Sequence, residues 1–400
     1  MLSDTSRPVV EATLPVVGAN IGEIAKRFYS HMFAEKPELL DGLFNRGNQA
    51  DGRQQQALAG SVAAFASFLV NKPGELPDHL LARISHKHVS LGLRPEQYKV
   101  VHDHLMWAIV DVLGEAVTPE VAAAWDEVYW LMANALINQE RAMYAAADVD
   151  PDSVWATWRV VERIQETADV VTFVVERTDG SAASPALPGQ YVSLKALMPD
   201  GVHQPRQYSL TRADDGRHRQ FAVKRVHGRT TPDGEVSNLL HAAVQVGDEL
   251  VLSAPFGEVV LKDTGRPVVF ASAGIGITPM AGMISHLAQA SATRPVTLLH
   301  ADKSEEAFAV RDQVRADLAK LPGASLSTWF SAAAGLEAAN QFSGAMDLSA
   351  VDLPADAEYY LCGPLGFMQA IRSALIERGV AAQDIQYEVF GPDLWQADVQ

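Results

Sequence analysis

The segment Gly274-Ile275-Gly276-Ile277-Thr278-Pro279 has the composition of a nucleotide-binding turn. It follows a strand-like run at residues 267–271 and precedes a helix-like segment. Glycines let the backbone approach a pyrophosphate closely, and the free N–H groups at a helix N-terminus point at such an anion. Thr278 and Pro279 suit the cap and the first turn of that helix. A plain turn is the alternative, but the position between a strand and a helix favours a nucleotide site.

The segment Leu361-Cys362-Gly363-Pro364 ends a second strand-like run just before another helix-like one. Ligands of open α/β sheets bind beyond the carboxyl ends of the strands, so this position places Cys362 near a ligand. The alternative is a buried cysteine that acts as a small hydrophobic residue.

A third group of residues has the chemistry to hold a flavin. Arg206-Gln207-Tyr208-Ser209-Leu210 places a cation, an aromatic face and a hydroxyl on one predicted strand. Gly234-Glu235-Val236-Ser237-Asn238 resembles a helix start that offers free N–H groups to a pyrophosphate. Taken alone, a tyrosine in a strand is more often a half-buried packing residue.

Among twelve histidines, His88 has the sequence context of an iron ligand. A haem-ligating imidazole uses one nitrogen for iron and needs its other N–H held by an acceptor. Tyr98 and Glu140 could converge on His88 and supply that acceptor. In the alternative, His86 and His88 are both solvated helix residues.

A cluster of aromatic and polar residues could form the opposite wall of such a pocket. Gln54 and Leu58 are four residues apart and share a helical face, while Phe28-Tyr29 and Met32-Phe33 mark an aromatic-rich earlier helix. Aromatic stripes at this spacing are usually core, which is the alternative here.

The elements that must position these residues differ along the chain. From Met1 to about Asp148, apolar residues recur at helical spacing, as in Leu58, Val62, Phe65 and Leu69. Proline cannot continue a helical hydrogen-bond ladder, so breaks are expected at Pro37, at Pro73 to Pro77, at Pro95 and at Pro119. This part of the chain is predicted to be all-α.

After a linker near residues 145–151, the hydrophobic period changes to two, most clearly at 158–164 and 170–175. Shorter strand-like runs follow at 190–194, 207–210, 220–226 and 249–252, separated by Gly, Pro and Asp turns. This pattern predicts a small antiparallel β-barrel.

From about Arg266, strand-like runs at 267–271, 296–300 and 359–361 alternate with helix-like segments, including a helix expected over 305–321. Such alternation predicts a parallel α/β nucleotide-binding sheet. The expected domains are 1–148 (all-α), 152–262 (β-barrel) and 263–400 (α/β).

Bulk properties limit the class of protein. A chain of 400 residues corresponds to roughly two or three domains. The net charge of -17 argues against binding a phosphate backbone, and the single cysteine, Cys362, excludes an internal disulfide. No signal peptide or apolar run long enough to cross a bilayer is evident. These properties predict a cytoplasmic protein that has no nucleic-acid partner and no stable membrane anchor. We also expect a monomer, although none of these properties bears on the oligomeric state.

Residues 155–392 resemble the ferredoxin–NADP reductase superfamily. Its flavin barrel carries an Arg-x-Tyr-Ser motif, and its nucleotide domain carries Gly-x-Gly-x-Thr-Pro and Cys-Gly-Pro, all of which occur above. The earlier part of the chain resembles the globin domain of bacterial and yeast flavohaemoglobins at Phe28-Tyr29, Leu43-Phe44-Asn45, Gln54 to Leu58, Lys87-His88, Glu96-Gln97-Tyr98 and Ile137-Asn138-Gln139-Glu140. A globin followed by this reductase is characteristic of the flavohaemoglobin family.

The resemblance implies roles for individual residues around a haem b group. His88 would be the proximal iron ligand, with Tyr98 and Glu140 forming a relay behind it that gives the imidazole anionic character. Phe44 would pack on the haem face. The distal pocket would be lined by Tyr29, Gln54 and Leu58.

The resemblance also implies sites for the other two cofactors. FAD would be bound by Tyr191, Arg206, Gln207, Tyr208, Ser209, Ser237, Val389, Phe390, Gly391 and Pro392. NADH or NADPH would be bound by Gly274, Ile275, Gly276, Ile277, Thr278, Pro279, Cys362, Gly363 and Pro364. Lys87 and Glu388 match residues that the family places between haem and flavin.

The family's activity is the dioxygenation of nitric oxide to nitrate, and the resemblance implies it here. A nicotinamide delivers two electrons as hydride whereas haem iron accepts one, so a flavin is needed as the converter. One alternative is an oxygen-storing or oxygen-sensing module, for which a reductase would be superfluous. The other is a general NAD(P)H diaphorase or haem-dependent alkyl hydroperoxide reductase.

Two departures from the family pattern affect the predicted sites. Ile277 stands where members often have Gln, which alters some nucleotide contacts. The segment Arg229-Thr230-Thr231-Pro232-Asp233 looks like an insertion before Gly234, beside the predicted flavin site.

The end of the second strand of the nucleotide sheet predicts a preference for NADH. Residues 296–300 are followed by Ala301-Asp302-Lys303-Ser304-Glu305-Glu306, in which three carboxylates outnumber one lysine. A 2′-phosphate would be repelled there, whereas a ribose 2′-hydroxyl can donate to a carboxylate. Lys303 with Ser304 could instead form a small phosphate site, and Arg311 could turn inward.

Overall fold

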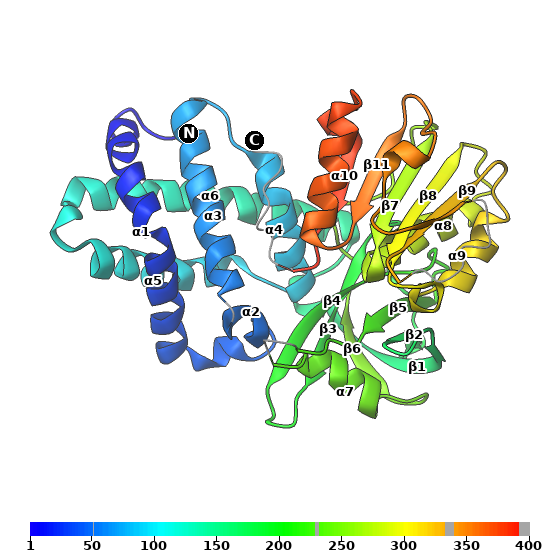
Figure 1. The fold of residues 1–400 in the computed structure, drawn as a ribbon. Coiled ribbons are helices and arrows are strands. Elements are labelled where there is room, and N and C mark those ends of the chain that lie inside the picture. Colours follow the sequence, from blue (N-terminus) through cyan, green and yellow to red (C-terminus); the bar gives the residue numbers. More distant parts are fainter. Residues whose placement is uncertain (51, 229–231, 333–339, 392–400) are drawn as a thin grey trace. The chain divides into compact units, whose positions relative to one another are not determined.

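The computed structural model describes residues 1–50, 52–228, 232–332 and 340–391, coloured along the sequence in Figure 1. These residues form two compact units. One contains Met1–Trp155 together with Lys195–Arg206 and Gly391, and the other contains Ala156–Leu194 and Gln207–Phe390.

The first unit is built mainly of helices, as predicted. They are α1 (Ser6–Glu35), η1 (Pro37–Leu40), α2 (Arg46–Ala50), α3 (Arg53–Asn71), α4 (Asp78–Leu91), α5 (Pro95–Leu113), η2 (Gly114–Ala116) and α6 (Pro119–Ala147). The expected proline breaks are confirmed, because Pro37, Pro95 and Pro119 each stand at the start of a helix. At that position the missing N–H removes no helical hydrogen bond.

The helices of this unit enclose one hydrophobic core. Helix α1 packs on α3, α5 and α6, while α4 packs on α6. The largest fully buried side chains here include Phe28, Met32 and Phe65. Phe28 and Met32 are four residues apart on α1, so both face the same core.

The first sheet has the strand order β4-β3-β6-β1-β2-β5 and forms a curled antiparallel half-barrel. Its strands are β1 (Trp155–Gln165), β2 (Val170–Arg177), β3 (Tyr191–Leu197), β4 (His203–Ser209), β5 (His218–Lys224) and β6 (Glu249–Ser253). A bridge between Leu210, just past β4, and Phe221 of β5 brings the two edge strands together. Helix α7 (Glu235–Ala243) packs beside β5. The predicted antiparallel barrel is confirmed in class.

The second sheet is parallel, in the order β10-β9-β8-β7-β11-β12. Its strands are β7 (Val268–Ala273), β8 (Val296–Asp302), β9 (Ser325–Phe330), β10 (Gln341–Ser343), β11 (Glu358–Cys362) and β12 (Ile385–Glu388). The associated helices are η4 (Gly274–Gly276), α8 (Ile277–Gln289), η5 (Glu305–Ala307), α9 (Arg311–Leu318), η6 (Leu348–Ala350), α10 (Leu365–Glu377) and η7 (Ala382–Asp384). The parallel α/β sheet is confirmed.

Some local predictions were wrong. The helix expected over 305–321 is interrupted, because Phe308 and Val310 are buried in the core and Val310 adopts a φ of 49° between η5 and α9. Strand β4 begins at His203, four residues before the predicted start at Gln207. Thr278 is not the cap of its helix: Gly276 is, and Thr278 lies in the first turn of α8.

Among the described residues, no helix has both the length and the apolar composition needed to cross a bilayer.

Candidate functional sites

His88, Tyr98 and Glu140 come together from three different helices, α4, α5 and α6. His88 Nδ1 lies 2.8 Å from Glu140 Oε1 and 3.0 Å from the Tyr98 hydroxyl. The Tyr98 hydroxyl donates to the same Glu140 oxygen at 2.5 Å. Since a carboxylate can only accept, Nδ1 of His88 carries the proton. Nε2 of a neutral His88 therefore keeps a lone pair for a metal, which is the arrangement that a haem ligand requires.

Burial strengthens this network. The Glu140 side chain is only 4% exposed, and in so apolar a setting each hydrogen bond to it is stronger than in water. Burial, followed by the nearby negative charge of Glu140, raises the pKa of Tyr98 far above its usual value. Tyr98 therefore remains a donor at every physiological pH.

Neighbouring contacts hold α4 in place. The Ser85 hydroxyl donates to Gln139 Oε1 of α6 at 2.9 Å, and the Tyr144 hydroxyl donates to the Leu93 carbonyl at 3.0 Å. Gly92 ends α4 with a φ of 77°, a conformation that only glycine adopts readily. Helix α4, which carries His88, is thus linked to α6 by a hydrogen bond between side chains. Just past its C-terminal end, a second hydrogen bond joins a side chain of α6 to a backbone carbonyl.

Tyr29 and Gln54 meet from α1 and α3. Their side chains are hydrogen-bonded, and burial raises the pKa of Tyr29 well above its usual range. Tyr29 packs against Phe33 at 5.7 Å and, edge-on, against Phe44 at 6.0 Å between ring centroids. Leu58 is half-buried one turn along α3 from Gln54. The predicted distal residues therefore place the Tyr29 hydroxyl next to Gln54 in otherwise apolar surroundings.

Lys87 is next to His88 on α4 and lies near Arg206. Burial, together with the positive charge of Arg206, lowers the pKa of Lys87 to about 8. Arg206 itself donates to the Pro205 carbonyl at 2.7 Å.

The predicted flavin residues lie on neighbouring strands of the first sheet. The Tyr208 ring stacks on Phe221 with centroids 5.5 Å apart, and Gln207 donates to the Ser193 hydroxyl at 2.9 Å. Ser209 and Tyr191 are buried. A side chain at Gly257 would contact the Tyr191 ring at 3.3 Å, so the backbone passes close over that ring.

The Ser237 side chain is hydrogen-bonded to the backbone of its own loop. Its hydroxyl accepts from the Val226 N–H at 3.1 Å and donates to the Gly234 carbonyl at 3.0 Å. The hydroxyl thereby shapes the start of α7, whose first N–H groups have no partner within the helix and suit a pyrophosphate. Residues 229–231 of the suspected insertion lie outside the described residues.

The two glycine loops of the α/β unit touch each other. A Cβ at Gly276 would lie 2.3 Å from the Cys362 carbonyl oxygen, and one at Gly363 would lie 3.0 Å from the Ala273 Cβ. Strands β7 and β11 are adjacent, with Ser272 opposite Cys362. In the sheet, β7 lies between β8, which follows it in the chain, and β11, which comes later, so the order of strands reverses at β7. The two loops flank this switch point, where such sheets bind ligands.

The side chains of the first loop mostly face the protein. Ile277, Thr278 and Pro279 are buried, and Thr278 donates to the Ile275 carbonyl at 2.9 Å. Any contribution of Ile277 to a nucleotide site would therefore come from its backbone N–H. Pro364 and Gly363 precede α10, and Cys362 is buried at the end of β11.

Strand β8 ends in a buried polar network that the sequence analysis did not identify. The Ser272 hydroxyl lies 2.9 Å from His300 Nδ1, and His300 Nε2 lies 3.5 Å from Asp302 Oδ2. Burial lowers the pKa of His300. A histidine within a strand, two residues before an aspartate at the strand end, was the available signal, since both side chains face one side of the sheet.

The carboxyl-terminal flavin residues continue from β12. Glu388 is buried and accepts the Val389 N–H at 3.1 Å, while Phe390 is 48% exposed. Gly391 has a φ of 125°. Pro392 lies outside the described residues.

Two family models match this chain. Residues 26–136 match the globin family, and residues 270–373 match the oxidoreductase NAD-binding domain. The first match contains the residues around His88 apart from Glu140, and the second contains both glycine loops.

Full-length relatives agree in sequence. The chain is 42% identical to a flavohemoprotein of Bordetella parapertussis, covering 98% of this chain and 99% of the relative. It is 40% identical to a flavohemoprotein of Deinococcus radiodurans, covering 98% of both chains.

Solved structures agree in fold. A flavohemoglobin of Malassezia yamatoensis, determined with bound FAD and heme, matches with a TM-score of 0.89 at 39% identity, covering 98% of this chain and 100% of the other. The FAD/NAD-binding domain of a nitric oxide dioxygenase from Vibrio cholerae matches with a TM-score of 0.56 at 36% identity, covering 59% of this chain and 99% of that domain.

Proposed function

This chain belongs to the flavohemoprotein family, and from that premise we propose that it binds haem, FAD and a nicotinamide nucleotide and converts nitric oxide to nitrate. Its relative from Vibrio cholerae bears the name nitric oxide dioxygenase. The oxidoreductase class follows from the family, and the specific substrate is the proposal.

The observation that carries the proposal is the hydrogen bond from His88 Nδ1 to the buried Glu140 carboxylate. A carboxylate partner makes the imidazole a stronger donor to iron than a backbone carbonyl would. An electron-rich proximal ligand favours chemistry on a bound diatomic molecule over its reversible storage.

When bound, the nicotinamide supplies a hydride, the flavin passes its two electrons on singly, and the haem iron activates oxygen for reaction with nitric oxide. The chain's own residues orient these groups. His88 offers Nε2, Glu140 and Tyr98 hold its other nitrogen, and the Tyr29 hydroxyl offers a hydrogen bond on the distal side. The N-termini of α7 and α8 offer N–H groups to the two pyrophosphates.

The buried Tyr29 has a defined task in this proposal. Its raised pKa keeps the hydroxyl protonated, so it can donate to a partly anionic diatomic ligand. Gln54, as its partner, fixes the orientation of the hydroxyl. The aromatic rings of Phe33 and Phe44 keep the remaining surroundings apolar, which suits the entry of nitric oxide.

The stoichiometry of the reaction tests this proposal. The purified holoprotein, supplied with NADH and oxygen, should consume nitric oxide and form one nitrate for each nitric oxide, with one NADH oxidised for every two. An absorption spectrum should show haem and flavin bands together. Faster turnover with an alkyl hydroperoxide than with nitric oxide would contradict the proposal and favour a peroxide reductase.

A further inference from the structure

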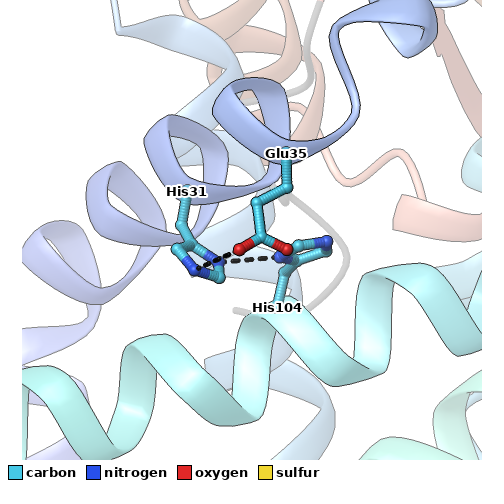
Figure 2. A group of neighbouring side chains, drawn as sticks. All are labelled: His31, Glu35 and His104. Atoms are coloured by element: carbon cyan, nitrogen blue, oxygen red, sulfur yellow. Dashed lines mark hydrogen bonds and ion pairs between the residues drawn. The ribbon is translucent and has the colours of Figure 1, made fainter.

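Three side chains with metal-binding atoms meet between helices α1 and α5, apart from the residues assigned above. His31 and Glu35 stand on successive turns of α1, and His104 faces them from α5 (Figure 2). One ligand atom from each lies within 4.8 Å of the other two. Among the residues that the structure describes, this is the one such group of histidine, cysteine or carboxylate side chains.

The two imidazoles direct nitrogens at each other. His31 Nδ1 and His104 Nδ1 are 2.8 Å apart, so at least one of them is unprotonated and points its lone pair into the gap. Metal ligands at zinc–nitrogen bond lengths of 2.0–2.1 Å in a tetrahedron are separated by about 3.3 Å. An opening of roughly half an ångström, the difference between these two separations, would thus admit a metal ion.

The cluster is held in place before any ion arrives. His31 stacks on Trp107 of α5 with ring centroids 3.7 Å apart and an angle of 8°, and His104 is only 6% exposed. The Glu35 carboxylate lies 3.4 Å from His31 Nε2, the ring nitrogen that does not face His104, and its side chain is 61% exposed. To bind the same ion as the two Nδ1 atoms, this exposed side chain must turn toward them. Two rigid imidazoles and one accessible carboxylate leave a route for an ion and room for water.

The preceding turn of α1 shows how a cation joins these two helices. Arg27 pairs with Glu23 of α1 at 2.9 Å and with Asp111 of α5 at 3.5 Å. One turn later, at His31, side chains of the same two helices meet again in the cluster shown in Figure 2. A divalent ion bound there would bridge the two helices, as Arg27 does one turn earlier.

We propose that His31, Glu35 and His104 bind a divalent transition-metal ion of the zinc class, with water completing its coordination. Two imidazoles and one carboxylate form the donor set that zinc takes in three-ligand sites. Hard ions such as calcium and magnesium prefer all-oxygen surroundings. The bound ion would cross-link α1 to α5.

The experiment measures zinc binding directly. Tag-free holoprotein is treated with a chelator, freed of it, and brought to equilibrium with increasing zinc across a dialysis membrane, with metal counted by mass spectrometry. We expect one saturable zinc ion per chain in addition to the haem iron. His31→Ala and Glu35→Gln should each weaken this binding at least about tenfold, because each removes one of three ligands.

Matched variants separate the cluster from general surface binding. Glu23→Gln makes the same change at an exposed carboxylate on the same helix, and His102→Ala removes a histidine that pairs with Asp103 and Asp126. Both should bind zinc like the unaltered chain. Equal loss in these controls, or no saturable zinc in the unaltered chain, would overturn the proposal.

A second measurement guards against misfolding. Because a ligand that binds only the folded state stabilises it, zinc should raise the thermal midpoint of the unaltered chain and of Glu23→Gln. It should raise that of Glu35→Gln less at the same zinc concentration, and the exposed position of Glu35 makes this residue tolerant of substitution. A zinc-dependent shift of equal size in Glu35→Gln would contradict the site.

Discussion

The Tyr98 hydroxyl donates to Glu140 Oε1 over 2.5 Å, and the same oxygen accepts the proton of His88 Nδ1. One carboxylate oxygen therefore orients both a tyrosine and a histidine that come from separate helices. Removing any member leaves a buried polar group without its partner, which costs about 1–3 kcal/mol.

His88→Ala should abolish stable haem binding while leaving FAD in place. The histidine supplies the one nitrogen that the Glu140 network leaves available for iron. Absorption spectra of the purified variant, recorded against the flavin band, measure both cofactors at once.

His86→Ala is the matched control, since His86 lies on the same helix two residues earlier. It should keep a normal haem spectrum. Haem loss in His86→Ala together with haem retention in His88→Ala would reverse the assignment.

Tyr29→Phe should release oxygen about tenfold faster or more. A hydrogen bond to a partly charged ligand contributes about 1.5–3 kcal/mol, and each 1.4 kcal/mol is about tenfold in an equilibrium. Flash photolysis of the reduced holoprotein measures the off-rate. Tyr359→Phe, at a buried tyrosine of the α/β unit, serves as control, and an unchanged off-rate in Tyr29→Phe would show that the hydroxyl has another role.

Gly276→Ala should impair reduction of the flavin by NADH while retaining FAD and haem. The added Cβ would lie 2.3 Å from the Cys362 carbonyl oxygen, so the two loops must separate. Overpacking of this kind costs about 1–3 kcal/mol and displaces the N–H groups at the start of α8. Stopped-flow mixing with NADH measures the effect.

Gly366→Ala adds the same methyl group where nothing lies within 4 Å, in the first turn of α10. Its flavin should be reduced at the normal rate. Equal slowing in both variants would mean that the contact with Cys362 is not responsible.

The protein should prefer NADH to NADPH, as the sequence predicts, and this preference should depend on Asp302. Its side chain is 6% exposed at the end of β8 and accepts the Lys303 N–H at 2.7 Å, while Arg311 and Arg315 both pair with Glu305. Each arginine is therefore already paired with a carboxylate and is not available to bind a 2′-phosphate. We expect higher kcat/KM with NADH than with NADPH.

Asp302→Asn should narrow that ratio by raising kcat/KM for NADPH, since it removes a negative charge from the strand end. Steady-state rates at one ionic strength measure it, with Asp312→Asn as an exposed control. Better efficiency with NADPH in the unaltered chain would contradict the prediction.

Much of the candidate site was predictable because its residues carry local signals. His88 was selected by a chemical requirement, an acceptor for its second nitrogen, and Glu140 meets it from 52 residues away. The glycine loops were recognisable from their place between strand and helix. By contrast, the cluster of His31, Glu35 and His104 depends on how two helices pack. No local sequence pattern around His31 indicates that His104, 73 residues away, lies next to it.

The fold class was predictable from the sequence, whereas the bounds of individual helices and strands were less so. Strand β8 was apparent from Val296, Leu298 and Leu299, which follow Pro295. The helix expected over 305–321 failed because Phe308 and Val310 turn into the core. Tertiary burial there outweighs the helical propensity of the flanking charged residues. The early start of β4 also escaped prediction, since His203 and Gln204 have little intrinsic preference for strands.

The hairpin segment Lys195–Arg206 groups with the helices rather than with the strands that follow it. Gln204 accepts the Arg46 N–H at 2.9 Å, and His203 lies 2.9 Å from Asp41. Severing the chain near Asp148 would leave these helical residues without partners that the sequence encodes more than fifty residues downstream. A globin excised at that linker would keep its hydrophobic core but lose these contacts, and a peptide spanning the hairpin should raise its thermal midpoint.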